Sequence, residues 1–294
     1  MDILITGTTG FIGSKVLKKI INKYSKNNII ALSSKILDVK TILHNNYNFD
    51  ENYLLNNGCE NVETIIHIGA FIPKSSKDAD NINNCFSNIN NTLKLLNSNL
   101  PKLKKIIFIS TIDIYSKDNG ILSENSKIEP ISIYGWSKLY CEKMIEIYSK
   151  EKGITCQILR LGHVFGEGEE LYKKILPLTI KKVINNEEIQ IWGDGKAIRT
   201  FIYIDDVVQA IINSINLQSS NIINIVGEEK ITINELINKI IKISGKNIKI
   251  SHVETNIPNR NLIFDNSLMK KLLLPEITKF DNGLEKEYKY MEKL

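Results

Sequence analysis

Cysteine is scarce in this sequence, and the few cysteines are not arranged for pairing. Four occur among 294 residues, and they show neither a CxxC pair nor the spacing of a metal-binding set. This pattern favours reduced structural thiols over a disulfide framework, and we expect no bound metal. The four are Cys59, Cys85, Cys141 and Cys156.

Long apolar runs are also missing. No stretch approaches the roughly 20 apolar residues that a membrane-spanning helix needs. The first residues read as a strand followed by a glycine turn, so we expect no secretory signal and no membrane partner. A hydrophobic share of 43% and a charged share of 24% are typical of a soluble globular protein. These features predict a cytoplasmic protein, long enough for one large domain or two unequal lobes.

Arginine is the third scarce residue, since only Arg160, Arg199 and Arg260 stand against a large excess of lysine. The formal charge is +5, but the lysines are mixed with acidic residues and no basic block alternates with aromatics. We therefore expect no nucleic-acid partner. In a chain that rarely uses arginine, each one is expected where a rigid planar fork is needed, as on phosphates. Arg160 lies inside an expected strand and is instead interpreted as a structural ion-pair partner.

A glycine-rich turn near the N-terminus is the first positive signal. An apolar run over residues 2–5 leads into it, and an amphipathic helix over 14–22 follows it. Gly7 permits a tight turn, Gly10 lets the backbone approach a pyrophosphate, and Gly13 lets the helix pack on the strand. The turn therefore predicts a dinucleotide-binding site. Its expected cofactor contacts are Gly7, Thr9, Gly10, Phe11, Ile12 and Gly13.

Strands and helices alternate along the chain, which predicts an α/β fold with a parallel sheet covered by helices on both faces. A second strand over residues 29–32 ends in Ser33, Ser34 and Lys35. A site for NAD usually has a carboxylate here, whereas the 2′-phosphate of NADP favours hydroxyls and a cation. The sequence therefore favours NADP(H). NAD(H) stays possible, because Asp38 could fold back as the missing acid.

A buried strand beginning at Glu63 ends in small residues that let a cofactor pass close to the backbone. The expected contacts there are Ile68, Gly69 and Ala70. His67, inside the same apolar strand, is interpreted as a hydrogen-bonded core residue rather than a catalyst.

Tyr134 and Lys138 form the candidate catalytic pair. They are four residues apart and so fall on one face of a helix, where the ammonium can favour the ionised phenol. Tyr134 is therefore a candidate proton donor and acceptor near neutral pH.

The glycine turn and the downstream YxxxK motif together resemble the short-chain dehydrogenase/reductase superfamily. The segments 110–115 and 193–207 narrow the resemblance to its extended branch of nucleotide-sugar epimerases, dehydratases and reductases, over nearly the whole chain. The resemblance implies that Thr111 polarises the substrate and that Asp113 lies at the substrate. It also implies that Arg199 binds a diphosphate. Arg260 either joins Arg199 or makes a surface salt bridge.

His163 stands where this branch usually has an asparagine. It either contacts the substrate or nicotinamide, or is an ordinary loop histidine. The resemblance further implies a Rossmann-type, doubly wound sheet, with residues 1–166 mainly binding the dinucleotide. Residues 167–294 would mainly form a smaller C-terminal α/β lobe for a nucleotide-sugar substrate, with a segment near 200–225 returning to the sheet. We expect a homodimer, formed through the YxxxK helix and the helix before it.

The preferred function is an NADP(H)-dependent reductase of a nucleotide-activated 4-keto (6-deoxy) sugar, because an NADP preference suggests a cofactor that comes and goes. In it a hydride reaches C4, Tyr134 donates a proton and Thr111 orients the oxygen. The alternative is an NAD-dependent C4 epimerase. A dehydratase is less favoured, because Ile112 and Asp113 occupy the places of its usual acids. A redox-sensing binding protein is disfavoured, because Thr111, Tyr134 and Lys138 are all present.

Overall fold

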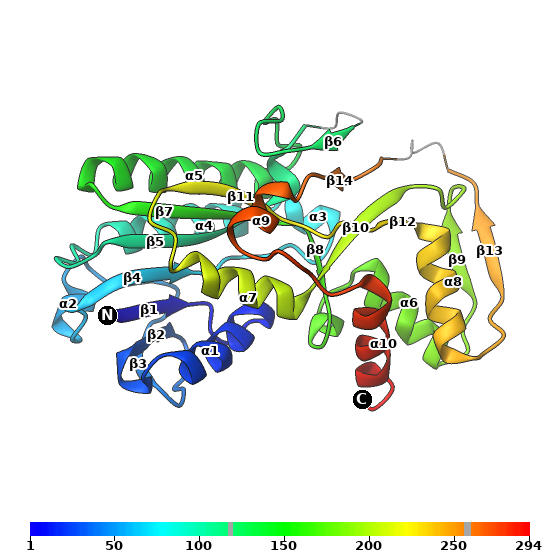
Figure 1. Ribbon diagram of the computed structural model, residues 1–294, viewed down its shortest axis with the longest axis horizontal. Coiled ribbons are helices and arrows are strands. Elements are labelled where there is room, and N and C mark those ends of the chain that lie inside the picture. Colours follow the sequence, from blue (N-terminus) through cyan, green and yellow to red (C-terminus); the bar gives the residue numbers. More distant parts are fainter. Residues whose placement is uncertain (117–119, 256–259) are drawn as a thin grey trace. The chain divides into compact units, whose positions relative to one another are not determined.

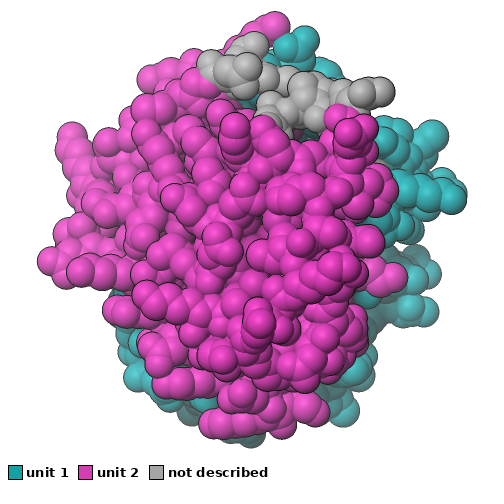
Figure 2. Space-filling model, turned by 90° about the vertical axis from the view of Figure 1, so that its right-hand side faces the viewer, with its two compact units in different colours: residues 1–116, 128–161, 207–223 teal, residues 117–127, 162–206, 224–294 magenta. Residues whose placement is uncertain are grey.

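The computed structural model describes residues 1–116, 120–255 and 260–294, and the chain forms two compact units. Unit 1 consists of residues 1–116, 128–161 and 207–223, and unit 2 of residues 117–127, 162–206 and 224–294. Figure 2 colours the two units separately. The chain enters each unit more than once, so neither unit is a continuous stretch of sequence.

A seven-stranded sheet is the core of unit 1. The pairings from β7 through β5, β4, β1 and β2 to β3 are parallel. The chain builds outward from β1 in one direction and then returns to build outward in the other, so the expected doubly wound α/β fold is confirmed. Across the sheet the strands are β11 (Asn221–Ile225), β7 (Thr155–Leu161), β5 (Lys105–Thr111), β4 (Val62–His67), β1 (Asp2–Thr6), β2 (Ile29–Ser33) and β3 (Lys40–Leu43).

Helices cover both faces of this sheet (Figure 1). On one face lie α4 (Ile82–Leu96) and α5 (Ile133–Lys152), and on the other α1 (Phe11–Lys23) and α7 (Ile204–Ser214). The strands are apolar runs buried along almost their whole length, as expected when both faces are covered. Two short helices, α2 (Tyr53–Asn56) and α3 (Ser76–Ala79), lie in the connections.

Two helix starts matter for the site. α1 begins at Phe11, three residues before the expected start, so Phe11, Ile12 and Gly13 form its first turn. α5 begins after Ser132, whose side chain accepts a hydrogen bond from the Gly135 amide.

Unit 2 contains smaller sheets. A three-stranded sheet has the order β12 (Lys230–Thr232), β10 (Ile198–Tyr203) and β8 (His163–Phe165). The pairs β9 (Ile189–Trp192) with β13 (Ile250–Val253), and β6 (Ile121–Leu122) with β14 (Ile263–Phe264), are parallel. Its helices are α6 (Ile175–Ile184), α8 (Ile233–Ser244), α9 (Ser267–Leu272) and α10 (Phe280–Met291). In the described ranges, no helix is long and apolar enough to cross a bilayer.

Two buried carboxyl groups lie in unit 2. Glu287 on α10 is fully buried, and burial together with the charge of Glu169 raises the pKa of Glu287 to about 9. Burial also raises the pKa of Glu169 to about 7, although its carboxylate lies 3.1 Å from the Lys174 ammonium. Near neutral pH, Glu287 therefore keeps its proton.

Replacing Glu287 with Gln is expected to stabilise the protein at alkaline pH. Between the ordinary carboxyl pKa of 4.5 and about 9, the folded state holds a proton that the unfolded chain has released. The free energy of unfolding therefore falls as the pH rises through this window, and Gln removes that cost. At pH 8 we expect a gain of about 1–3 kcal/mol in urea unfolding, and little change at pH 5.

The matched control is Glu285→Gln, which removes an exposed carboxylate paired with Lys289 on the same helix. The control should leave the pH dependence of stability unchanged. A Glu287→Gln variant with the parent's pH dependence would show that this carboxyl is not the group that titrates.

Candidate active site

The glycine turn after β1 is packed backbone against backbone. Gly7 has a φ of +72°, and a Cβ placed on it would lie 2.5 Å from the amide nitrogen of Gly69. A Cβ on Gly13 would lie 2.0 Å from the carbonyl oxygen of Gly7. Gly10 is the N-cap of α1 and offers no side chain to its first amides. The turn, the start of α1 and the end of β4 thus form the bare-backbone cradle that a pyrophosphate needs.

Hydrogen bonds fix the strand ends beside this turn. The hydroxyl of Thr6 lies 2.8 Å from Nδ1 of His67 and accepts a bond from the Gly69 amide at 2.9 Å. Nε2 of His67 lies 3.1 Å from the hydroxyl of Thr92 on α4. Burial, and then the charge of Lys138, lower the pKa of His67 to about 3. His67 is therefore a neutral core residue, as expected, and it ties β1 and β4 to α4.

One residue of the turn was not singled out from the sequence. Thr8 is 2% exposed, and its hydroxyl has no hydrogen-bond partner within the described residues. Thr9, which was expected to contact the cofactor, is exposed. Because Thr8 and Thr9 are adjacent and identical, the sequence does not distinguish them. Only the path of the backbone decides which side chain points inward. The buried hydroxyl and the bare cradle both fit a dinucleotide.

The end of β2 carries hydroxyls and a cation. Ser33 is buried and accepts a hydrogen bond from the Lys35 amide at 3.1 Å, while Ser34 and Lys35 are exposed. Asp38 does not fold back toward them as a substitute acid, because it pairs with Lys26 at 2.6 Å on the surface. At the end of β4, Ile68, Gly69 and Ala70 follow directly and are partly buried.

The candidate catalytic pair lies on the buried face of α5. Tyr134 is 5% exposed and Lys138 is 2% exposed. The Lys138 ammonium lies 4.1 Å from the centre of the Phe108 ring. Burial lowers the pKa of Lys138 to about 8, while Cys141 and Glu142 act in the opposite direction. Lys138 is therefore still mostly a cation at neutral pH.

Thr111 reaches the same part of unit 1 from the sheet. It ends β5 and caps the short helix η2 (Ile112–Ile114), accepting a hydrogen bond from the Asp113 amide at 3.2 Å. Thr111 is buried and Asp113 is exposed. A Cβ on Gly135 would lie 2.6 Å from the Asp113 carbonyl oxygen. The segment that carries Thr111 thus rests directly against the first turn of the helix that carries Tyr134.

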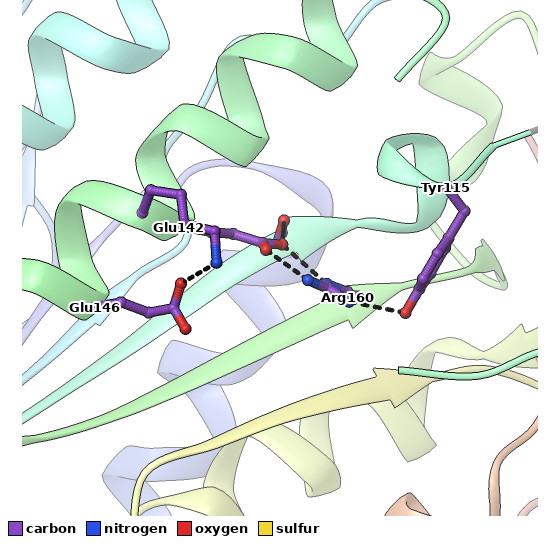
Figure 3. A network of polar contacts seen from close by, with 6 residues as sticks. Tyr115, Glu142, Glu146 and Arg160 are labelled. Atoms are coloured by element: carbon purple, nitrogen blue, oxygen red, sulfur yellow. Dashed lines mark hydrogen bonds and ion pairs between the residues drawn. The ribbon is translucent and has the colours of Figure 1, made fainter. Parts of the chain in front are cut away.

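The expected role of Arg160 as a structural ion-pair partner is confirmed. It lies on β7 and pairs with Glu142 of α5, and it also bonds to the hydroxyl of Tyr115 (Figure 3).

The remaining candidate site residues, Arg199, Arg260 and His163, lie in unit 2. Arg199 on β10 is partly buried and donates to the carbonyl oxygens of Ile198 and Arg260. His163 lies on β8, so it is a strand residue rather than a loop residue. Its Nε2 is buried with no hydrogen-bond partner in the described part of the chain. Burial, followed by the charges of Arg199, Lys174 and Arg260, lowers the pKa of His163 to about 3. A neutral histidine thus lies among three cations.

The doubly wound sheet and the glycine cradle of unit 1 are those of a dinucleotide-binding enzyme. Residues 3–226 match the model of the NAD dependent epimerase/dehydratase family. The chain belongs to this family, which confirms the resemblance seen in the sequence.

Many known proteins are similar over the full chain, among them the following three. The uncharacterized UDP-glucose epimerase YtcB of Bacillus subtilis is 30% identical, with 100% of this chain and 99% of that protein covered. A UDP-glucuronic acid 4-epimerase from Bacillus cereus, solved with UDP-glucuronic acid and NAD, has a TM-score of 0.85 and 28% identity. A UDP-glucose 4-epimerase from Thermotoga maritima, solved with UDP-glucose, has a TM-score of 0.84 and 26% identity. Both structures cover 100% of this chain and 99% of their own.

These findings bear on two expectations. They favour the C4 epimerase, which the sequence placed second, over the 4-keto reductase that it placed first. They also point to NAD and lend no support to a preference for NADP. The NADP expectation depended on Ser33, Ser34 and Lys35 at the end of β2, and the absence of a carboxylate among them does not itself exclude NAD.

Proposed function

We propose that this protein is an NAD-dependent C4 epimerase of a UDP-activated sugar. The observation that carries the proposal is the arrangement within unit 1. Buried Tyr134 and Lys138 share one face of α5, and the Thr111 segment packs on the first turn of that helix. The epimerases that resemble the whole chain supply the substrate class.

Each catalytic side chain has a defined task in this proposal. Bound NAD would supply the hydride acceptor and donor for sugar C4. Tyr134, as phenolate, takes the proton of the O4 hydroxyl and later returns it to O4. The Lys138 ammonium favours the phenolate, and the Thr111 hydroxyl donates a hydrogen bond to O4. Atoms and electrons balance, because the hydride and the proton that leave the sugar both return to it, the hydride to the opposite face of C4.

The cradle residues Gly7, Gly10, Gly13 and Gly69 would hold the pyrophosphate of the cofactor, and Lys138 its nicotinamide ribose. In unit 2, Arg199 would bind the substrate diphosphate through charge-assisted hydrogen bonds, with Arg260 beside it. His163 would offer a neutral ring nitrogen to the substrate, since burial and then the neighbouring cations lower its pKa and keep it unprotonated.

The experiment is to incubate the purified protein separately with UDP-glucose and UDP-glucuronic acid and to follow the products by proton NMR. We expect a mixture of the two C4 epimers without added cofactor and without net redox change. Consumption of NADPH in step with a 4-keto sugar nucleotide, and no epimer from either substrate, would favour the reductase instead.

The proposed enzyme is a homodimer through α4 and α5. These helices expose a continuous apolar surface, in which Phe86, Trp136 and Tyr140 are each more than half exposed. Isolated exposed apolar residues are ordinary, but a continuous patch of this kind marks an interaction site.

We expect the Phe86→Glu/Tyr140→Glu variant to sediment as a monomer where the parent sediments as a dimer. Trp192→Glu, which changes an exposed tryptophan of unit 2, should leave the dimer intact; a dimeric double variant would refute this interface.

A further inference from the structure

A buried ion pair joins elements that carry the catalytic groups. The side chains of Arg160 on β7 and Glu142 on α5 are 3% and 0% exposed. Arg160 donates from Nε to one carboxylate oxygen at 3.1 Å and from Nη2 to the other at 2.8 Å. Such a bidentate contact fixes direction as well as distance. Because desolvation largely offsets the attraction in a buried ion pair, stability alone is a weak reason for its presence.

Its remaining contacts reach the neighbours of Thr111. The hydroxyl of Ser110, the residue before Thr111, donates to Glu142 at 2.5 Å. The hydroxyl of Tyr115, the residue after η2, accepts from Nη1 of Arg160 at 2.9 Å. Figure 3 shows Arg160 between Glu142 and Tyr115. The network therefore holds the chain on both sides of the Thr111–Ile114 segment.

On α5, Glu142 also lies close to the catalytic residues along the chain. Glu142 follows Lys138 by one helical turn and Tyr134 by two, so the three residues share one face of α5. We propose that the Arg160–Glu142 ion pair is a clamp that holds α5 in register with the end of β5. The clamp thereby sets the position of Tyr134 and Lys138 relative to Thr111. Arg160 and Glu142 are positioning residues, since neither touches the reacting atoms.

A second contact holds α5 against the β5–η2 segment. At the start of α5, Gly135 lies against the Asp113 carbonyl so closely that a Cβ would come within 2.6 Å of it. The helix is thus fixed to the β5–η2 segment at two points, Gly135 and Glu142, with Lys138 between them. When the Glu142 contact is lost, the helix can shift or tilt about the remaining Gly135 contact.

The clamp also acts on Lys138 through charge. The Glu142 carboxylate raises the pKa of Lys138 against the larger effect of burial. Cys141 on α5 acts on this pKa in the same direction as Glu142, and the Lys138 charge in turn lowers the pKa of His67 on β4. Tyr134, one helical turn before Lys138, is the group that this ammonium serves. His67 is uncharged near neutral pH, and the Phe108 ring of β5 also faces the ammonium. Removal of Glu142 therefore takes away the nearby negative charge that supports the cation.

The test replaces the clamp by apolar side chains of similar size, in the double variant Glu142→Leu/Arg160→Met. Such replacements of buried ion pairs often leave stability unchanged or improved. We expect a thermal midpoint close to the parent's and unchanged KM and NAD content, with kcat at least about tenfold lower. We also expect the alkaline limb of the kcat profile to move to lower pH. A folded double variant with the parent's kcat and pH profile would overturn the proposal.

Two further variants keep the test decisive. Tyr115→Phe removes one hydroxyl and retains the ring over the guanidinium, so it tests the clamp even if the double variant does not fold. It is expected to lower kcat severalfold, and a parent kcat would count against the clamp. Glu146→Gln neutralises a partly exposed carboxylate that pairs with Lys143 on the same helix. This control should leave kcat unchanged; an equal loss would mean that any charge change on α5 has the same effect.

The kinetic readouts rest on the proposed function, so a second readout is independent of substrate. Tyrosinate difference absorbance, taken between each protein and its Tyr134→Phe counterpart, follows the ionisation of Tyr134 alone. In the double variant, Lys138 is no longer held beside the phenol, and we expect ionisation at higher pH than in the parent. An unmoved transition would overturn the clamp, whereas a parent without epimerase activity but with the expected shift would refute only the proposed function.

Discussion

Tyr134→Phe is expected to lower kcat by about 10²–10⁴-fold while the variant keeps its fold and its cofactor. Removal of the hydroxyl removes the group that exchanges a proton with O4, but the ring still fills its buried place on α5. Initial rates of C4 epimerisation measure the loss, and the nicotinamide content of the purified variant measures cofactor retention.

The matched control is Tyr148→Phe, which removes a hydroxyl from a partly buried tyrosine further along the same helix. This variant should turn over at the parent's rate. If Tyr134→Phe also kept the parent's rate, the phenol would not be the acid–base group and the proposed mechanism would be wrong.

Gly13→Ala is expected to abolish cofactor retention. The new Cβ would lie 2.0 Å from the Gly7 carbonyl oxygen, which is a backbone atom and cannot rotate away. The start of α1 must then move off the turn, at a cost of roughly 1–3 kcal/mol or more in stability. Thermal unfolding and the absorbance of bound nicotinamide after purification measure the two effects.

Gly10→Ala is the comparison for this prediction. Its Cβ would meet nothing closer than the Gly7 carbonyl oxygen at 3.4 Å, so the fold should be unaffected. Weaker cofactor binding with the parent's thermal midpoint would fit a backbone that approaches a pyrophosphate at Gly10. A Gly13→Ala protein that purified with its cofactor and melted like the parent would contradict the packing described for the turn.

The parts of the fold that sequence could predict are those with a local cause. The apolar run before Gly7 and the helix after Gly13 are readable because strand, glycine turn and amphipathic helix follow one another directly. The YxxxK spacing is enough by itself to place Tyr134 and Lys138 on one face of a helix. His67 could likewise be assigned to the core, because it lies within an apolar strand.

The parts that sequence could not predict depend on distant partners. Nothing near Glu142 in the chain indicates that it would meet Arg160 and Ser110. The choice between Thr8 and Thr9 depends on the path of the turn. α10 has apolar residues at helical spacing, but the Phe165 and Tyr203 rings that pack against Gly283 come from β8 and β10.

The preference for NADP found no support in the comparisons, for a related reason. Ser33, Ser34 and Lys35 form only the end of one strand, whereas a dinucleotide is held along its whole length. The comparisons, which extend over most or all of the chain, favour NAD and C4 epimerisation. Thr111, Tyr134 and Lys138 all lie in unit 1, and their catalytic roles stay predictions.

The most direct measurement uses a UDP-sugar that carries deuterium at C4, incubated with the purified protein and no added cofactor. We expect the C4 epimer to form and to keep the deuterium at C4, because the same hydride that leaves the sugar returns to it. An epimer that had lost the label to solvent, or a reaction that proceeded only with added NADPH, would contradict the proposed mechanism.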